Sequence, residues 1–242
     1  MTYWAFCEDL SSDTVIIGDA EAHHLLHVLR LAPGATLTAF DGRGTEAQVI
    51  VEKSTRRDLS CRVVARVVHQ KQDSALITVI ASPPKADRLK WMVEKLTELG
   101  VDRLVLLNTQ RTVVTPGDAR VDKLRANVVA ACKQCRRPML MHLEPLQSFA
   151  AVLETATNPN KPGTCFIAHP DAPNMAAQKV EPAAGKNITL LIGPEGGFTD
   201  DEVSAAVLAG ATRISWPETT LRIETAAVVF ATMLMSQRKT VD

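Results

Sequence analysis

From residue 74 onward, short apolar stretches alternate with longer amphipathic ones. The apolar stretches are residues 76–81, 104–108, 139–143, 165–168, 188–192 and 211–215. The amphipathic stretches are residues 87–99, 119–135, 148–156, a helix that begins after Thr199, and residues 224–237. Strands that alternate with helices of this length predict an α/β fold, with a mostly parallel sheet covered by helices on both faces. Glu202, three residues after Thr199, also predicts a capping box.

The first part of the chain has a different pattern. Short strand-like stretches at residues 14–17, 35–40, 46–52 and 59–68 are separated by the turn sequences Pro33-Gly34 and Asp41-Gly42-Arg43-Gly44. One helix is expected at about residues 20–31. This pattern predicts a small β-barrel-like domain. The change near residue 72 predicts two domains, residues 1–72 and 73–242.

The charges of the chain balance overall but are unevenly distributed. The 242 residues hold 27 Lys and Arg against 27 Asp and Glu. Counted along the chain, residues 1–73 carry a net −2, residues 74–137 a net +6 and residues 138–242 a net −4. The middle segment is therefore the candidate surface for an anionic partner. The alternative is that these charges solvate two helices.

Several classes of protein are excluded by composition. The five cysteines, at positions 7, 61, 132, 135 and 165, are poor material for a disulfide framework and suit a reducing cytoplasm. The N-terminus has early acids instead of a basic and then apolar order, so we expect no secretory signal. The most apolar run, residues 226–235, is too short to span a bilayer. We therefore expect a cytoplasmic protein without a membrane segment.

A predicted buried strand runs directly into a loop with three glycines. The segment is Leu190-Leu191-Ile192-Gly193-Pro194-Glu195-Gly196-Gly197-Phe198. In open parallel sheets, ligands bind beyond the carboxyl ends of strands, and glycine lets the backbone approach them closely. The segment matches neither the dinucleotide pattern nor the P-loop, and Glu195 would repel a triphosphate. It favours a ligand held by backbone amides and carbonyls, such as an adenosine moiety; the alternative is a tight strand-to-helix turn.

A second candidate loop precedes the last helix, in the sequence Leu221-Arg222-Ile223-Glu224-Thr225-Ala226-Ala227. An acid at a helix start is ordinary capping, so Glu224 has a purely structural interpretation as well as a functional one. Arg222 fits the local rule less well, because a cation at a helix N-terminus opposes the helix dipole. Such a conflict between local preference and sequence is typical of functional sites.

Two further patterns point to metal or redox chemistry only weakly. His23 and His27 have the spacing of metal ligands on a helix, but no cysteine or acidic cluster lies beside them in the sequence. Cys132 and Cys135 form a C-x-x-C pair inside a predicted helix, without a second pair. We interpret the histidines as RNA-facing or packing residues and the cysteines as packing residues, and expect no metal.

Several motifs occur in a specific order along the chain, together with the two C-terminal loops: His24-Leu25-Leu26-His27-Val28-Leu29-Arg30, Phe40-Asp41-Gly42, Lys95-Leu96-Thr97-Glu98-Leu99-Gly100-Val101, Gln110-Arg111, Ala131-Cys132-Lys133-Gln134-Cys135-Arg136-Arg137 and His169-Pro170. In these motifs the chain resembles the RsmE family of small-subunit ribosomal RNA methyltransferases in the SPOUT superfamily. The resemblance extends over nearly the whole length. The two loops together are its most specific part.

The resemblance implies a PUA-like barrel that helps to grip RNA, followed by a SPOUT α/β domain with a deep trefoil knot. It implies a homodimer that methylates N3 of a uridine near the 3′ end of 16S rRNA in an assembled small subunit. S-adenosylmethionine would contact Ile192, Gly193, Pro194, Glu195, Gly196, Gly197, His169, Leu221, Arg222, Thr225 and Ala226. The rRNA would contact His24, His27, Arg30, Arg111, Lys133, Arg136 and Arg137.

The implied reaction has definite requirements. Uridine N3 is a poor nucleophile until its proton leaves, and methyl transfer is an in-line displacement at a sulfonium carbon. A general base near N3, or donors that stabilise the uridine anion at its carbonyl oxygens, would help. We expect Arg222 to be such a donor. Glu195 and Glu224 are the candidate bases, with the alternative that either one only orders a loop.

The sequence departs from the family pattern ahead of the second loop. Members commonly carry Leu-Gly-x-Arg there, whereas this chain has Trp216-Pro217-Glu218-Thr219-Thr220. Proline in place of glycine restricts the backbone, and the arginine is absent. Two other functions stay open: methylation of another RNA position by the same fold, and a non-catalytic RNA-binding role in ribosome assembly.

Overall fold

The computed structural model describes residues 3–55, 57–69, 75–157, 163–174, 187–217 and 219–236. The chain divides into two compact units. The first comprises Met1–Lys71 together with Val129–Leu140, and the second comprises Gln72–Val128 and Met141–Asp242. The helix α3 (Asp118–Cys135) begins in the second unit, and its last turns group with the first. Residues 158–162 of the Pro-, Asn- and Gly-rich stretch Asn158–Gly163, whose composition is typical of a surface loop, lie outside the described residues, as do Glu218 and Gln237.

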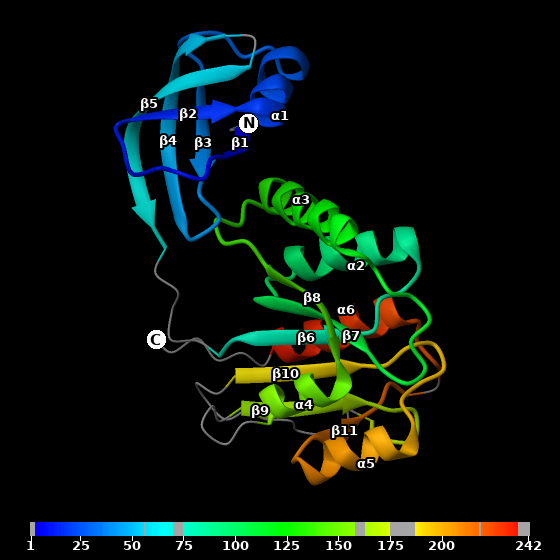
Figure 1. The fold of residues 1–242 in the computed structure, drawn as a ribbon. Helices are drawn as coiled ribbons and strands as arrows, with labels where there is room; N and C mark the ends of the chain where they lie inside the picture. The colour runs from blue at the N-terminus through cyan, green and yellow to red at the C-terminus, as the bar shows by residue number, and fades with distance from the viewer. Residues whose placement is uncertain are drawn as a thin grey trace. The chain divides into compact units, whose positions relative to one another are not determined.

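The first unit is built on one sheet. Within the described residues its strands are β1 (Tyr3–Phe6), β2 (Thr14–Gly18), β3 (Thr36–Phe40), β4 (Thr45–Ser54) and β5 (Asp58–Val68). They lie in the order β1-β3-β4-β5-β2, with β1 parallel to β3 and the remaining pairs antiparallel (Figure 1). Alternate side chains of each strand point into an apolar core that includes Val15, Ile17, Leu37, Val49 and Leu59. Burial of side chains of this size stabilises the fold by about 1.5–3 kcal/mol each.

The prediction of a single helix at residues 20–31 is wrong in detail. This part of the chain forms α1 (Asp19–His23), followed by a π-helical turn, η1 (His24–Val28). The Leu29 N–H donates to the carbonyl of His24, the wider π-type spacing, and Arg30 ends the helix with a left-handed φ of 54°. The wider turn directs Leu25 into the core of the unit, where it is 1% exposed.

Two further differences concern strands. The sequence pattern did not predict β1, a four-residue strand that is stabilised by its pairing with β3. It also predicted a strand at residues 139–143, whereas β8 (His142–Ser148) begins later. The reason is that Met139 forms an isolated bridge with the Gly42 turn, and the Leu140 N–H donates to the Gly42 carbonyl at 2.9 Å.

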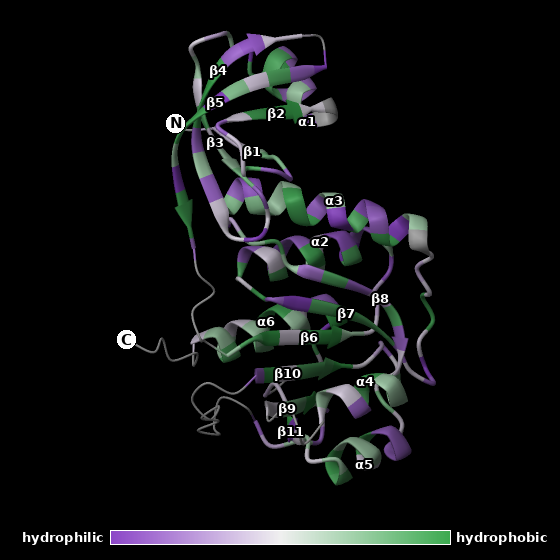
Figure 2. Cartoon of the chain, turned by 60° about the vertical axis from the view of Figure 1, so that its left-hand side comes forward, coloured by the Kyte–Doolittle hydropathy of each residue, from purple (hydrophilic) through white to green (hydrophobic). Residues whose placement is uncertain are grey.

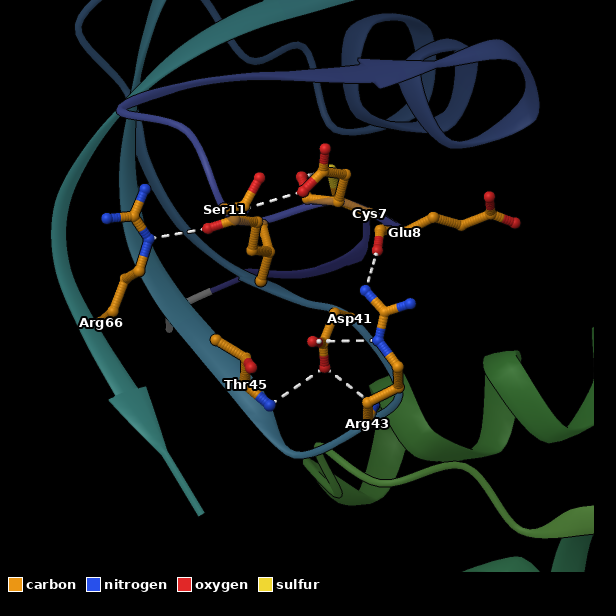
Figure 3. A network of polar contacts seen from close by, with 9 residues as sticks. Cys7, Glu8, Ser11, Asp41, Arg43, Thr45 and Arg66 are labelled. Carbon is orange, nitrogen blue, oxygen red and sulfur yellow. Dashed lines mark hydrogen bonds and ion pairs between the residues drawn. The ribbon is translucent and has the colours of Figure 1, made fainter. Parts of the chain in front are cut away.

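The turn between β3 and β4 is organised by one carboxylate (Figure 3). The side chain of Asp41 is only 6% exposed and accepts hydrogen bonds from the backbone N–H groups of Arg43 and Thr45, at 2.7 and 3.0 Å. Arg43 ion pairs with Asp41 at 3.5 Å and donates to the Glu8 carbonyl at 2.7 Å. Burial alone would raise the pKa of Asp41, but these N–H donors and the Arg43 guanidinium together hold that pKa below its ordinary value.

The second unit contains a parallel sheet. Its described strands are β6 (Ile77–Ala81), β7 (Arg103–Asn108), β8, β9 (Gly163–Ala168), β10 (Asn187–Ile192) and β11 (Thr212–Ile214). They lie in the order β11-β9-β10-β6-β7-β8, and every neighbouring pair is parallel. This confirms the α/β architecture predicted from the alternation of strands and helices.

Helices cover both faces of this sheet. They are α2 (Ala86–Glu98), α4 (Phe149–Ala156), α5 (Asp200–Leu208) and α6 (Ile223–Ser236). One face packs Val105, Ile167 and Leu191 against α4 and α5, while α6 packs on β6 and β10 and against α2. Figure 1 shows α4 and α6 on opposite sides of the sheet. Because both faces are covered, the four consecutive central residues of β7, 104–107, are all buried, which is typical of parallel strands.

The apolar and polar residues are distributed as this packing requires. Figure 2 shows α3 with hydrophilic and hydrophobic residues alternating along its length, whereas the carboxyl end of β10 is hydrophobic. None of the helices within the described residues is both long enough and apolar enough to cross a membrane.

All five cysteines are free thiols. Burial raises the pKa of Cys165, on β9, to about 12, and burial, with smaller contributions from Cys7 and Glu52, raises the pKa of Cys61 to about 11. Neither thiol is ionised at neutral pH, so neither is a ready nucleophile.

The Asp41 network gives the first prediction. Asp41→Ala should lower the free energy of unfolding by about 2 kcal/mol at neutral pH, because two N–H groups of a partly buried turn lose a charged acceptor. The pKa of Asp41 is lower in the folded than in the unfolded chain, so its contribution is complete above the ordinary value of 3.8 and is lost as the pH falls through the folded value. The difference between the two proteins should therefore shrink in acid.

Urea unfolding of the full chain over a series of pH values measures this difference. Asp13→Ala is the matched control, because the Asp13 side chain is 96% exposed and should contribute little. A difference for Asp41→Ala that stays constant down to strongly acidic pH would contradict the assigned role of the carboxylate.

Candidate functional site

Three adjacent strands of the second unit end at one cavity of about 750 Å³. The segment after β9 contributes His169, the segment after β10 contributes the loop of residues 193–198, and the end of β11 contributes Ser215 and Trp216. The strands are parallel, so their carboxyl ends meet at the same edge of the sheet. That edge is where open α/β sheets bind their ligands.

The cavity brings the two predicted loops together. Of the residues assigned to the cofactor, ten line it: Ile192, Gly193, Pro194, Glu195, Gly196, Gly197, His169, Leu221, Arg222 and Ala226. Thr225 and Glu224 are not among the lining residues, whereas Arg111, which was expected to contact RNA, is one of them. Trp216, Thr219 and Thr220, from the segment in which the sequence departs from the family pattern, also line the cavity.

The loop after β10 is compact because of two of its glycines. The Gly197 N–H donates to the Pro194 carbonyl at 2.8 Å, and Gly197 has a φ of 70°, which side chains disfavour. At Gly193 an added Cβ would lie 3.0 Å from the ring of Phe198, which is buried in the apolar cluster on one face of the sheet. Glycine at position 193 therefore lets Phe198 anchor the loop from inside.

A second segment fixes the same loop from outside. Arg111, which follows β7, donates from Nη1 to the carbonyl of Gly196 at 2.7 Å. The neighbouring Gln110 N–H donates to Glu202 Oε1 at 3.0 Å. Glu202 also completes the capping box with Thr199, which confirms the box predicted from the sequence. The charge of Arg111 thus lies at the cavity, supported by the first turn of α5.

The segment after β9 is held by β11. The His169 N–H donates to the Ile214 carbonyl at 2.9 Å, and the Ser215 hydroxyl donates to the Ala172 carbonyl at 2.7 Å. These bonds place His169, Pro170 and Asp171 on the cavity wall. His169 was predicted from the sequence. Asp171 was not, because its position shortly after a strand is its only signal in the sequence.

Arg222 occupies the position just before α6. Its carbonyl accepts the Ala226 N–H at 2.8 Å, the first hydrogen bond of the helix, and its side chain is exposed and lines the cavity. The predicted conflict with the helix dipole is therefore present in the fold. Arg222 brings a positive charge to the same cavity that Glu195 lines with a negative one.

Behind the cavity wall, one arginine bridges two carboxylates. Arg88, in α2, lies 3.6 Å from Glu195 and 3.6 Å from Glu224. Glu224 is buried, and its Oε2 atom has no hydrogen-bond partner among the described residues. Arg88 was not predicted from the sequence, since nothing near it distinguishes it from the other charged residues of the basic segment.

The residues proposed for RNA contact in the first unit lie on its two helical segments. His24, His27 and Arg30 are exposed, on and just after η1, and Arg136 is exposed at the end of α3. Lys133 ion pairs with Glu21, with Nζ 2.8 Å from Oε2, so part of its charge is neutralised within the unit. Arg137 is only partly exposed.

The two histidines with metal-ligand spacing contact each other. The rings of His23 and His27 lie 4.6 Å apart between centroids. Among the described residues there is no group of three or more His, Cys, Asp or Glu side chains able to hold a metal ion.

The sequence matches known families over most of its length. Residues 71–235 match a family model described as an RNA methyltransferase domain, and residues 17–64 match one described as an RNA methyltransferase PUA domain. The Ribosomal RNA small subunit methyltransferase E of Mycobacterium bovis is 31% identical over 226 residues, which cover 91% of this chain and 85% of that protein. The protein of the same name from Synechocystis is 27% identical and covers 92% of this chain and 73% of that protein.

Solved structures share the fold. A probable rRNA-methyltransferase from Porphyromonas gingivalis is 29% identical, with a TM-score of 0.85 over 98% of each chain. A Ribosomal RNA small subunit methyltransferase E from Neisseria gonorrhoeae, solved bound to S-adenosyl methionine, has a TM-score of 0.86 at 24% identity, again over 98% of each chain. At 24% identity, the similarity to the Neisseria structure shows that the two chains share a fold.

The glycine loop gives the second prediction. Gly193→Ala should lower the free energy of unfolding by about 1–3 kcal/mol, because the new Cβ would overlap the Phe198 ring. Gly196→Ala is the matched control, since its Cβ would lie 3.4 Å from the flexible side chain of Arg111. Urea unfolding compares the two variants. Equal effects would show that the contact with Phe198 does not set the shape of the loop.

Proposed function

Because this chain belongs to the RsmE family of small-subunit ribosomal RNA methyltransferases, we propose that it transfers a methyl group from S-adenosylmethionine to N3 of a uridine near the 3′ end of 16S rRNA. The substrate is the rRNA within a small ribosomal subunit, and the enzyme works in the cytoplasm as a homodimer. Residues 73–242 carry the transfer, and residues 1–72 help to hold the RNA. The observation that carries this proposal is the convergence of both family loops on one cavity.

The cavity suits the proposed methyl donor. Its volume is within the usual range for small-ligand sites, and its wall combines apolar side chains with backbone groups of a glycine loop. Ile192, Leu221 and Phe230 supply apolar surface suited to an adenine ring. The carboxylates of Glu195 and Asp171 suit a cationic ligand, and Arg111 suits the carboxylate of an amino acid. Thr225, off the wall, would act through the backbone of the helix start.

In this function the protein positions the uracil ring and controls the removal of its N3 proton. S-adenosylmethionine supplies a methyl group on a positively charged sulfur, which becomes a neutral thioether on transfer. At the uridine the N3–H bond breaks, the N3–CH₃ bond forms and the proton leaves to a base or to water. Arg222 stabilises the negative charge that develops on the uracil carbonyl oxygens. Its exposed position on the cavity wall supports this role.

The two carboxylates differ in their suitability as bases. Glu195 lines the cavity and its side chain is 47% exposed, which suits a group that must reach the N3 proton. Glu224 is buried next to Arg88 and is absent from the cavity wall, which supports the alternative that it orders the second loop. We therefore propose Glu195 as the base and Glu224 as a positioning residue.

Mass mapping tests the target. Small subunits that lack this modification are incubated with the protein and S-adenosylmethionine, and the digested 16S rRNA is searched for the added methyl group. One methyl on N3 of a uridine near the 3′ end supports the proposal. A methyl group on a ribose or on another base would show that the protein is a methyltransferase with a different target. Absence of both methylation and cofactor binding would favour a non-catalytic assembly factor.

The third prediction concerns Arg222. Arg222→Ala should abolish methylation while leaving the affinity for S-adenosylmethionine nearly intact, because the guanidinium acts on the uracil. Loss of an oxyanion-type donor lowers kcat by about 10²–10³-fold or more. Single-turnover methylation and calorimetric titration measure the two quantities. Arg213→Ala, which removes an exposed arginine from β11, is the control. Normal turnover by Arg222→Ala would rule out the role.

The fourth prediction concerns the first unit. If Arg30 contacts an RNA phosphate, Arg30→Gln should weaken binding to small subunits and reduce the slope of log K against log salt by about 1. Arg136→Gln should behave in the same way. Arg57→Gln, at an exposed turn of the same unit, is the control. Binding titrations at several salt concentrations check this, and an unchanged slope for Arg30→Gln would count against a phosphate contact.

A further inference from the structure

Arg88 belongs to neither loop of the cavity, yet it contacts one carboxylate from each. Its Nη2 atom lies 3.6 Å from Glu195 Oε1, and its Nη1 atom lies 3.6 Å from Glu224 Oε1. Glu195 is in the loop after β10, and Glu224 is in the first turn of α6. One guanidinium thus connects α2 to two of the segments around the cavity, the loop after β10 and the start of α6.

The local position of Arg88 would by itself be unfavourable. Arg88 is the third residue of α2, in the first turn, where a cation opposes the helix dipole. The two carboxylates offset this cost, since each is an opposite charge within ion-pair distance. The charge of Arg88 is therefore explained by what it contacts in space and not by the helix it belongs to.

Glu224 depends on this arginine more than Glu195 does. The side chain of Glu224 is 8% exposed and that of Glu195 is 47% exposed, so only the carboxylate of Glu195 is well solvated by water. Oε2 of Glu224 is buried without a hydrogen-bond partner in the described part of the chain. A buried carboxylate that loses its cation is left uncompensated, which is strongly destabilising for the segment that carries it.

The arrangement requires arginine in particular. The two carboxylates are reached by two different nitrogens of one planar guanidinium. A lysine has one ammonium on a flexible chain, a point charge that cannot present two separated nitrogens in a fixed plane.

We propose that Arg88 is a positioning residue of the methyl-transfer site: it holds Glu195 and Glu224 on one guanidinium, and so keeps the loop after β10 and the start of α6 in the arrangement that forms the cofactor cavity. This rests on the proposed function. Arg88 itself is absent from the cavity wall and acts through the two glutamates.

The fifth prediction tests this with matched variants of the full-length protein. Arg88→Gln should weaken S-adenosylmethionine binding about tenfold, measured by calorimetric titration. The affinity of Arg88→Lys for S-adenosylmethionine should lie between those of Arg88→Gln and the wild type, because the positive charge is retained but the two separated guanidinium nitrogens are lost. Lys90→Gln removes a positive charge from an exposed position of the same helix and should bind as the wild type does.

A double-mutant cycle tests the contact itself. Glu224→Gln alone should weaken cofactor binding, and adding it to Arg88→Gln should weaken binding much less than it does in the wild-type background. Independent, multiplying effects would overturn the proposal. The kinetic counterpart is that Arg88→Gln raises KM for the cofactor and lowers kcat, whereas a purely global loss of folding would only reduce the active fraction.

Amide hydrogen exchange of the protein without ligand gives a readout independent of activity. In Arg88→Gln the amides of residues 193–198 and 221–226 should exchange faster, while those of β7, away from the contact, keep their wild-type rates. Faster exchange everywhere, or no change in either loop, would overturn the proposal.

The same experiments separate failure of this inference from failure of the proposed function. A wild-type protein that binds no S-adenosylmethionine would remove the proposed function and with it the positioning role. A wild-type protein that binds, with Arg88→Gln binding equally well, would overturn the role of Arg88 alone.

Discussion

Parallel pairing of β9 with β10 and with β11 is the constraint on which the site depends. The registers Leu191↔Ile167 and Ile214↔Ala168 bring the last residues of the three strands to one edge of the sheet. The segments that follow must therefore leave the sheet side by side, although they are far apart in the sequence. The cavity forms between these segments and the start of α6, whose position is fixed by its packing on β6 and β10.

Polar contacts then give these segments a defined shape. Arg111 holds the carbonyl of Gly196, and Glu202 connects the segment after β7 to α5. Arg88 approaches the same loop from α2. Glu202 and Arg88 belong to helices that are fixed by apolar packing, and Arg111 lies in the turn that follows β7, so the loop is held from outside by all three. Such support is what keeps catalytic groups in a productive geometry.

The sequence alone predicted the parts of this arrangement that have local signals. Alternating periodicity identified the parallel sheet, the glycines after β10 identified one wall of the cavity, and the Thr199–Glu202 pair identified the start of α5. The family resemblance connected the two loops, which periodicity could not do.

What the sequence did not predict depends on contacts between distant residues. Arg111 and Gly196 are 85 positions apart, and neither carries a local mark of the other. The same holds for Arg88 with its two glutamates, and for Met139, which pairs with a turn near the start of the chain instead of extending β8. The deep trefoil knot and the homodimer stay predictions; the connection from β9 to β10 includes residues 175–186, outside the described ranges.

A crystal structure of the protein grown with S-adenosylmethionine tests the central claim most directly. The account predicts density for the cofactor between the loop of residues 193–198 and the start of α6, with its methyl group directed toward the space that Arg222 and Glu195 share. Density at another place, or an empty cavity at a saturating cofactor concentration, would contradict the assignment of this cavity as the methyl-transfer site.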